Sequence, residues 1–160
     1  MTAVDGDLIL RTVATPPEMA VVVDIRRRVF GNEQRILLPR YQDPEDDFSF
    51  NLLAYVDEKA VGTGRLSPIY ERATIPTITW VATLPPYRGR GIGTAIVAAL
   101  VREADERGYE AVFLNSQVHA NPLYEAFGFR PLGHAQLIHG IPHQAMIRRS
   151  PGGTDVPAPH

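Results

Sequence analysis

The chain has 160 residues, of which 44% are hydrophobic and 21% are charged, and its formal net charge is −2. This length and composition fit one soluble globular domain, and the near-neutral charge gives no general attraction to nucleic acid or to an anionic membrane. Because cysteine is absent, disulfides, thiolate metal ligands and a cysteine nucleophile are excluded. No apolar run approaches the ~18 residues of a membrane span, and the acidic N-terminus is unlike a signal peptide, so we expect a cytoplasmic protein.

The first thirty residues predict a strand followed by a helix. Residues 8–13 alternate apolar and polar side chains, as a strand does. Residues 15–18, Thr-Pro-Pro-Glu, form a capping-box pattern, so a helix is expected from there through Phe30. Three consecutive residues spread around a helix, and we therefore interpret Arg26–Arg28 as a solvated helix face rather than a nucleic-acid patch.

A long polar connection separates this helix from a predicted hairpin. Residues 31–49 are acidic and contain two prolines, so no regular element is expected, and a connection of this length suggests a function. Residues 51–56 and 60–66 are expected to pair around a polar turn at 57–59. A further strand is predicted at 78–83.

The second half of the chain alternates strands and helices. An apolar stripe from Ile92 to Ala104 predicts a helix that ends near Gly108. The remaining expected elements are a strand at 111–115, a short helix at 122–127, and strands at 132–139 and 144–149. Residues 1–149 are predicted to form one domain, and residues 150–160 a disordered tail, because the tail is rich in proline and glycine and has few apolar side chains to bury.

A glycine-rich loop precedes the helix that starts at Ile92. In the sequence Arg88-Gly89-Arg90-Gly91-Ile92-Gly93-Thr94, glycines alternate with larger residues. Glycines leave backbone N–H groups free to approach an anion where a helix begins, and the helix dipole reinforces this. The loop therefore predicts a phosphate-bearing ligand. A Walker loop is excluded because no lysine follows Gly93, and a dinucleotide fingerprint fails because its third glycine position holds Thr94 or Ile96.

The spacing of Arg88, Gly91 and Gly93 resembles the acetyl-CoA loop of the GCN5-related N-acetyltransferases. A second segment, Asn121-Pro122-Leu123-Tyr124-Glu125-Ala126-Phe127-Gly128-Phe129, is similar to another signature of that family. Phe30-Gly31-Asn32-Glu33-Gln34 and Gly140-Ile141-Pro142-His143 resemble its ElaA-like branch. The resemblance implies an α+β fold with a twisted, mostly antiparallel central sheet of six to seven strands and helices on both faces.

The same resemblance implies an acyltransferase. The expected reaction is direct transfer of an acetyl group from acetyl-CoA to a primary amine of a small molecule or peptide, with no metal. His139 and His143 have the spacing of a helical metal pair, but Pro142 between them breaks such a helix. A homodimer is left open. The alternative function is a catalytically weak CoA-binding sensor with the same fold, which the lack of an acid in residues 77–83 supports.

The resemblance also implies roles for residues that bind the co-substrate. It places Tyr124 near the sulfur of CoA, where a phenol of pKa about 10 suits protonation of a thiolate, and packing is the alternative role. Residues 81–83 would pair with the pantetheine arm, and an amide of Val81 or Thr83 would stabilise the oxyanion. The expected binding residues are Val81, Ala82, Thr83, Arg88, Gly89, Arg90, Gly91, Ile92, Gly93, Thr94, Asn121 and Tyr124.

The general base is less defined, because residues 77–83 lack the glutamate that many family members carry there. Glu33 is a candidate, either as the base or as an anchor of its loop. His119 would relay a proton through water or simply lie at the surface. The acids that follow Glu33 would attract a cationic acceptor or be merely solvated. The expected substrate-binding residues are Glu33, Gln34, Asp46 and His119, and the base stays open between Glu33, His119, the downstream acids and a water chain.

Overall fold

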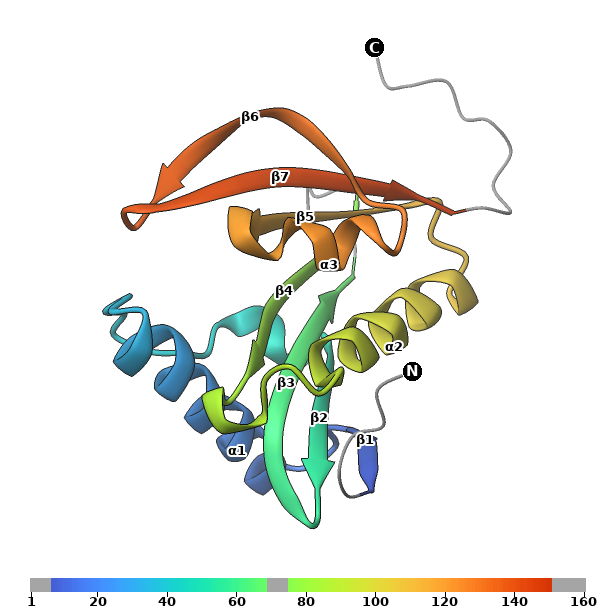
Figure 1. The fold of residues 1–160 in the computed structure, drawn as a ribbon. Coiled ribbons are helices and arrows are strands. Elements are labelled where there is room, and N and C mark those ends of the chain that lie inside the picture. The colour runs from blue at the N-terminus through green and yellow to red at the C-terminus, as the bar shows by residue number, and fades with distance from the viewer. Residues whose placement is uncertain (1–6, 69–74, 151–160) are drawn as a thin grey trace.

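The structure is a computed structural model that describes residues 7–68 and 75–150. These residues form one seven-stranded sheet in the order β1-β2-β3-β4-β5-β7-β6 (Figure 1). The strands are β1 (Leu8–Thr12), β2 (Phe50–Val56), β3 (Lys59–Ser67), β4 (Thr77–Thr83), β5 (Ala111–Gln117), β6 (Arg130–Ile138) and β7 (Ile141–Arg149). Neighbouring strands pair antiparallel, except β4 and β5, which are parallel. The predicted fold class is confirmed.

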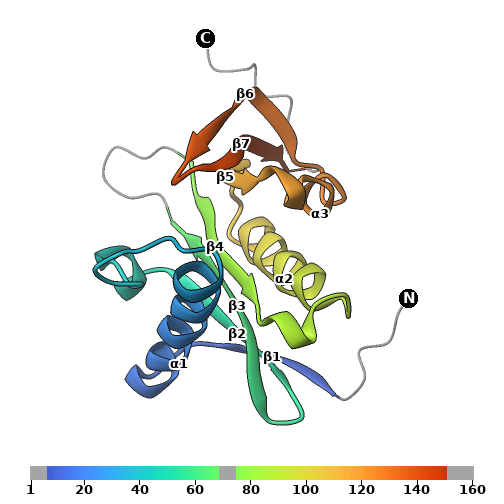
Figure 2. The same ribbon diagram turned by 60° about the vertical axis from the view of Figure 1, so that its left-hand side comes forward.

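Helices cover both faces of the sheet, as predicted. The helices are α1 (Pro16–Arg26), α2 (Ile92–Glu106) and α3 (Asn121–Glu125). In Figure 2, α1 and α2 lie on opposite sides of β3 and β4. The short helical turns are η1 (Arg27–Glu33, a π-helix) and the 3-10 turns η2 (Pro44–Asp47), η3 (Pro85–Tyr87) and η4 (Val118–Ala120). The capping box at the start of α1 is present, with the Thr15 hydroxyl accepting from the Glu18 amide.

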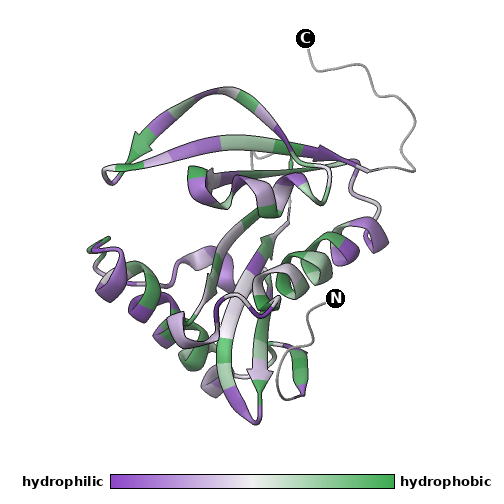
Figure 3. Cartoon of the chain, in the orientation of Figure 1, coloured by the Kyte–Doolittle hydropathy of each residue, from purple (hydrophilic) through white to green (hydrophobic). Residues whose placement is uncertain are grey.

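The main core lies between α2 and the sheet. The apolar stripe of α2 is buried, and Figure 3 shows its first turns mostly green and its C-terminal end purple. Two glycines of β3 let the helix approach: a Cβ at Gly64 would lie 2.6 Å from Ile96, and one at Gly62 would lie 2.9 Å from the same side chain. These glycines therefore fix the distance between α2 and β3. A smaller core between α1 and the other face contains Val22, Ile25, Val29, Leu53, Ala82 and Leu84.

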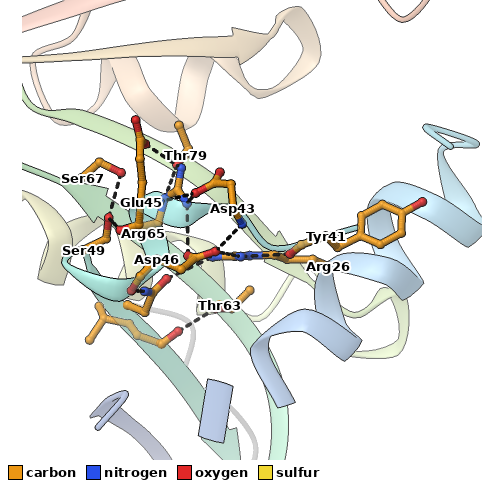
Figure 4. Close-up of polar contacts among 12 residues, drawn as sticks. Arg26, Tyr41, Asp43, Glu45, Asp46, Ser49, Thr63, Arg65, Ser67 and Thr79 are labelled. Carbon is orange, nitrogen blue, oxygen red and sulfur yellow. Dashed lines mark hydrogen bonds and ion pairs between the residues drawn. The ribbon is translucent and has the colours of Figure 1, made fainter. Parts of the chain in front are cut away.

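Two predictions are wrong, one for the acidic connection and one for Arg26 of α1. The segment is not without an element, because Asp43 caps the 3-10 turn η2 through the Glu45 amide. Arg26 is not solvated: its side chain is fully buried and its guanidinium makes two hydrogen bonds of 3.0 Å with Asp46 (Figure 4). Arg27 and Arg28 are exposed, as expected.

Asp46 is the centre of this buried network. Its side chain is 1% exposed and lies between Arg26 and Arg65, whose Nη1 is 3.1 Å from Asp46 Oδ1. Arg65 also binds the carboxylates of Asp43 and Glu45. Three of the acids that were expected to attract an acceptor, Asp43, Glu45 and Asp46, are thus paired with arginines of the same chain, whereas Asp47 is exposed. The buried Asp46 carboxylate is not placed to meet a substrate.

Some predictions concern regions that the structure describes only in part. Residues 151–160 of the expected tail lie outside the described residues, and the single-domain organisation of residues 1–149 stays a prediction. Within residues 7–68 and 75–150, no helix is long and apolar enough to cross a bilayer.

Candidate active site

A cavity of ≈ 910 Å³ opens where β4 and β5 separate. The two strands pair at Thr77↔Phe113 and Ile78↔Leu114 and then diverge, as Figure 1 shows. Beyond Ile78, no further pairing between β4 and β5 occurs in the described residues. The segment 79–83 of β4 therefore lines the cavity with backbone that β5 does not cover.

A β-bulge shapes the β4 wall of this cavity. The register of β4 against β3 shifts between Thr63 and Arg65, and Trp80, at the shift, has a φ of 57°. Bulky residues seldom adopt this left-handed conformation, and such strain is concentrated at functional sites. The Trp80 ring contacts Phe30 edge-on at 5.3 Å and has the Arg26 guanidinium 5.0 Å from its centroid. Because the bulge directly precedes Val81, it determines how the amides of residues 81–83 are aimed.

The predicted phosphate loop forms the N-terminal end of α2 and lines the same cavity. Gly89 and Gly91 have φ values of 77° and 81°, which favour glycine. Gly91 is the N-cap of α2, no side chain caps the helix, and the first helical bond runs from Ala95 to Gly91. The amides of residues 92–94 thus have no partner within the helix and are suited to an anion. A Cβ at Gly93 would meet only Leu123 and Thr83 side-chain atoms, at 3.8 Å, so the protein leaves space there.

Tyr124 and Asn121 of α3 lie beside the loop. Tyr124 lines the cavity and packs edge-on against Phe129 at 5.9 Å. Its burial raises the pKa of the Tyr124 hydroxyl well above the ordinary value, so the group stays protonated at neutral pH. Asn121 does not line the cavity, but its Oδ1 is buried and has no hydrogen-bond partner among the described residues. Such an oxygen is costly to leave unpaired, and it fits an acceptor for a ligand or for water.

The π-helix η1 forms the opposite wall and is tied to the other elements by side chains. Glu33 accepts two hydrogen bonds of 2.6 Å from Arg88, and Arg88 Nε donates to the Thr83 carbonyl. These bonds from Arg88 lower the pKa of Glu33 below its ordinary value, which makes it a weaker base. Gln34 and Gln117 exchange amide hydrogen bonds of 3.2 and 2.6 Å, which join η1 to the end of β5.

Most of the predicted site residues meet at this cavity. Its lining includes Glu33, Gln34, Val81, Ala82, Thr83, Arg88, Gly89, Gly91, Ile92, Gly93, Thr94, His119 and Tyr124. Three predicted residues are not in the lining: Asn121 lies nearby on α3, Arg90 lies over the Tyr87 ring at 5.3 Å, and Asp46 is in the buried network. In the part of the chain that is described, no group of three or more His, Asp or Glu side chains is placed to hold a metal ion.

Sequence reasoning missed several lining residues, among them Phe30, Trp80, Asn115, Gln117 and His143. Asn115 and Gln117 alternate along β5, and the β5–β7 register places His143 opposite Gln117. These polar residues at alternate positions near the end of a strand were the sequence signal that could have identified them as lining residues. The pairing that brings His143 to them depends on register, which a single sequence does not define.

The sheet thus splits between two parallel strands, and the glycine loop lies at the opening. The sequence matches the acetyltransferase (GNAT) family over residues 19–129, and the chain belongs to that family. It is 30% identical over 127 residues to the uncharacterized N-acetyltransferase YjcF of Bacillus subtilis, covering 78% of this chain and 87% of YjcF. It is 33% identical over 138 residues to the protein sll0451 of Synechocystis, covering 83% and 87%.

Solved structures show the same fold. Escherichia coli ElaA superimposes with a TM-score of 0.79 at 20% identity, over 89% of this chain and 100% of ElaA. Salmonella typhimurium yncA, solved with acetyl-CoA, has a TM-score of 0.74 at 14% identity, over 96% and 99%. The family expected from the two signatures is confirmed, and an ElaA protein is among its structural relatives.

Proposed function

We propose that this enzyme is an acetyl-CoA-dependent N-acetyltransferase that moves an acetyl group directly to a primary amine of a small molecule or peptide. One observation carries the proposal: the free amides at the start of α2, the uncovered segment of β4 and Tyr124 all line one cavity. Family membership and the acetyl-CoA bound to the related yncA support it.

In this proposal the co-substrate is held mainly by backbone. The amides of residues 92–94 bind the pyrophosphate, and residues 81–83 pair with the pantetheine arm. Acetyl-CoA supplies an activated acyl group as a thioester. The amide of Val81 or Thr83 stabilises the negative charge that develops on the acyl oxygen. Asn121 stays a proposed orienting residue for the ligand, although its Oδ1, which is unpaired among the described residues, lies outside the cavity lining.

Tyr124 is proposed to be the general acid. Its hydroxyl is protonated at neutral pH, and Tyr124 lines the cavity in which the leaving thiolate would develop charge. Gln34 and His119 would form part of the acceptor wall, by which we mean the side of the cavity where the amine would bind. Glu33 is proposed to anchor η1 rather than to act as base, because Arg88 occupies both of its oxygens. Asp46 has no part in the proposed site.

The acceptor must lose a proton before it attacks. An alkyl ammonium of pKa about 10.4 costs roughly 4.6 kcal/mol to present as a neutral amine at pH 7. A positioned base therefore contributes directly to the rate, and the lining residues must supply it or hold a water that does.

The experiment is thiol release from acetyl-CoA in the presence of a panel of primary amines, with the acetylated amine identified by mass spectrometry. The proposal expects acetylated product, and expects the rate to fall strongly in Tyr124→Phe. Calorimetric binding of CoA without thiol release for any amine would favour the sensor alternative instead. Absence of CoA binding would contradict both functions.

A further inference from the structure

His143 lies on the wall of the cavity that faces η1. It belongs to β7 and pairs in register with Gln117, whose side chain binds Gln34 of η1. All three residues line the cavity. On the neighbouring strand β6, its register partner is Gln136, an uncharged residue. The imidazole is therefore placed with the acceptor wall rather than with the phosphate loop.

A backbone hydrogen bond fixes the tautomer of the His143 ring. Its Nδ1 is 2.7 Å from the carbonyl oxygen of Ile141. A carbonyl oxygen only accepts, so Nδ1 must carry the proton and donate it. In the neutral imidazole the lone pair is then on Nε2, which has no hydrogen-bond partner in the described part of the chain. This is the arrangement in which an imidazole accepts a proton from a bound molecule.

The other titratable and charged groups of the lining are poorer bases. Arg88 is permanently charged, and Glu33 is bound to it with a lowered pKa. Tyr124 is a buried phenol whose raised pKa keeps its proton in place at neutral pH, and Tyr87 is also a phenol. His119 lies on the exposed turn η4, and no hydrogen bond to its ring is found within residues 7–68 and 75–150.

We propose that His143 is the general base of the acetyl transfer; this rests on the proposed function. Nε2 takes one proton from the acceptor ammonium, directly or through one water. The amine lone pair then bonds to the acyl carbon, and the carbon–sulfur bond breaks. The sulfur receives the proton of the Tyr124 hydroxyl, and the second proton that the nitrogen sheds as the amide forms restores Tyr124. The proton on His143 leaves to solvent.

The test compares two amines of similar shape and different basicity. Benzylamine is an ammonium at pH 7, whereas O-benzylhydroxylamine is already neutral and needs no base. In His143→Gln we expect kcat/KM for benzylamine to fall by about 10²–10⁴-fold, the range of general base catalysis, and that for O-benzylhydroxylamine to change by less than about threefold. The acidic limb of the pH profile with benzylamine should also disappear.

One variant controls for indirect effects. His134→Gln removes an exposed imidazole of β6 that is outside the cavity lining. It should retain turnover of both amines within about threefold, and His143→Gln should retain the wild-type CoA affinity. An equal loss for both amines in His143→Gln, or undiminished turnover of benzylamine, overturns the proposal.

A second measurement does not depend on turnover. Long-range ¹H–¹⁵N NMR spectra of the ¹⁵N-histidine-labelled protein, assigned with His143→Gln, should show the Nδ1–H tautomer for neutral His143. A ring protonated on Nε2 overturns the proposal even if the enzyme is active. If the tautomer is as expected but neither these amines nor the wider panel is acetylated, the proposed function fails, and the base role falls with it.

Discussion

Glu33 and Arg88, which are 55 positions apart in the chain, are joined by two hydrogen bonds of 2.6 Å. The pair connects the end of η1 to the loop that precedes α2, and Arg88 Nε also holds the Thr83 carbonyl. Because the Arg88 guanidinium is committed to these partners, the proposed binding of a phosphate by the loop would rest mainly on its backbone amides. The end of η1 and the loop are thus held together by one arginine.

Replacement of Glu33 by Gln should therefore alter the anchor and leave the chemistry in place. Both side chains are partly exposed, and such pairs contribute about 0–1 kcal/mol to the free energy of unfolding. We expect a small decrease in melting temperature, kcat within tenfold of wild type and an unchanged pH profile. Loss of a titrating limb in this variant would instead identify Glu33 as the base.

Gly93→Ala should separate binding of CoA from folding. Gly93 is in the first turn of α2, its φ is not in the left-handed region, and an added Cβ makes only ordinary contacts. We expect an unchanged or higher melting temperature and at least tenfold weaker calorimetric binding of CoA, because the methyl group enters the space above the amides. Gly91→Ala is a poorer test, since a φ of 81° costs an alanine about 1–2 kcal/mol. Unchanged affinity in Gly93→Ala would place the pyrophosphate elsewhere.

Tyr124→Phe keeps the ring and its contact with Phe129 and removes the acidic proton. We expect kcat to fall by about 10²–10⁴-fold with little change in affinity for acetyl-CoA. Tyr87→Phe, which removes the other phenol of the cavity lining, should keep kcat within threefold. Comparable kcat values for the two variants would assign Tyr124 to packing.

Asp46→Asn should destabilise the protein because it leaves two buried arginines without their shared carboxylate. Breaking a buried ion pair in this way costs about 3–5 kcal/mol. The neighbouring Asp47 is exposed, and Asp47→Asn should change the free energy of unfolding by no more than about 0.5 kcal/mol. Urea denaturation of the wild type, Asp46→Asn and Asp47→Asn measures both changes in the free energy of unfolding. Equal stability of Asp46→Asn and wild type would show that Arg26 and Arg65 find other partners.

The lowered pKa of the Asp46 carboxyl also predicts that the protein loses stability in acid. Burial alone would raise the pKa of this carboxyl, but hydrogen bonds from Arg26 and from the Asp43 amide, with the charge of both arginines, lower it below the ordinary value of 3.8. A carboxyl with a depressed pKa contributes stability that is fully present above its unfolded pKa and is lost as the pH falls through its folded pKa. We expect the melting temperature to drop below about pH 4. The part of this drop that is due to Asp46 should be missing in Asp46→Asn.

Features that are encoded in short segments could be predicted from the sequence. Features that depend on contacts between distant segments could not. The capping box around Thr15 and the glycine loop around Gly91 are local patterns, and both appear where expected. Arg26 was misplaced because a charged side chain was assumed to face solvent, although its spacing from Val22 and Val29 puts it on the buried stripe of α1. Its counter-charge Asp46 comes from twenty positions away, and no local pattern links them. The strained φ of Trp80 is likewise set by packing and strand register.

Because the contact between β4 and β5 is short, a ligand bound between these strands would add to the stability of the folded enzyme. Every other neighbouring pair of strands shares a longer register, so the two antiparallel parts of the sheet are joined by backbone mainly at Thr77 and Ile78. A molecule bound between β4 and β5 would touch both parts and favour the folded state. At a hundredfold excess over its Kd, such a ligand adds about 2.7 kcal/mol to the free energy of unfolding. We expect cells with little acetyl-CoA to contain less of the folded enzyme, so that its abundance follows the metabolic state that sets its rate.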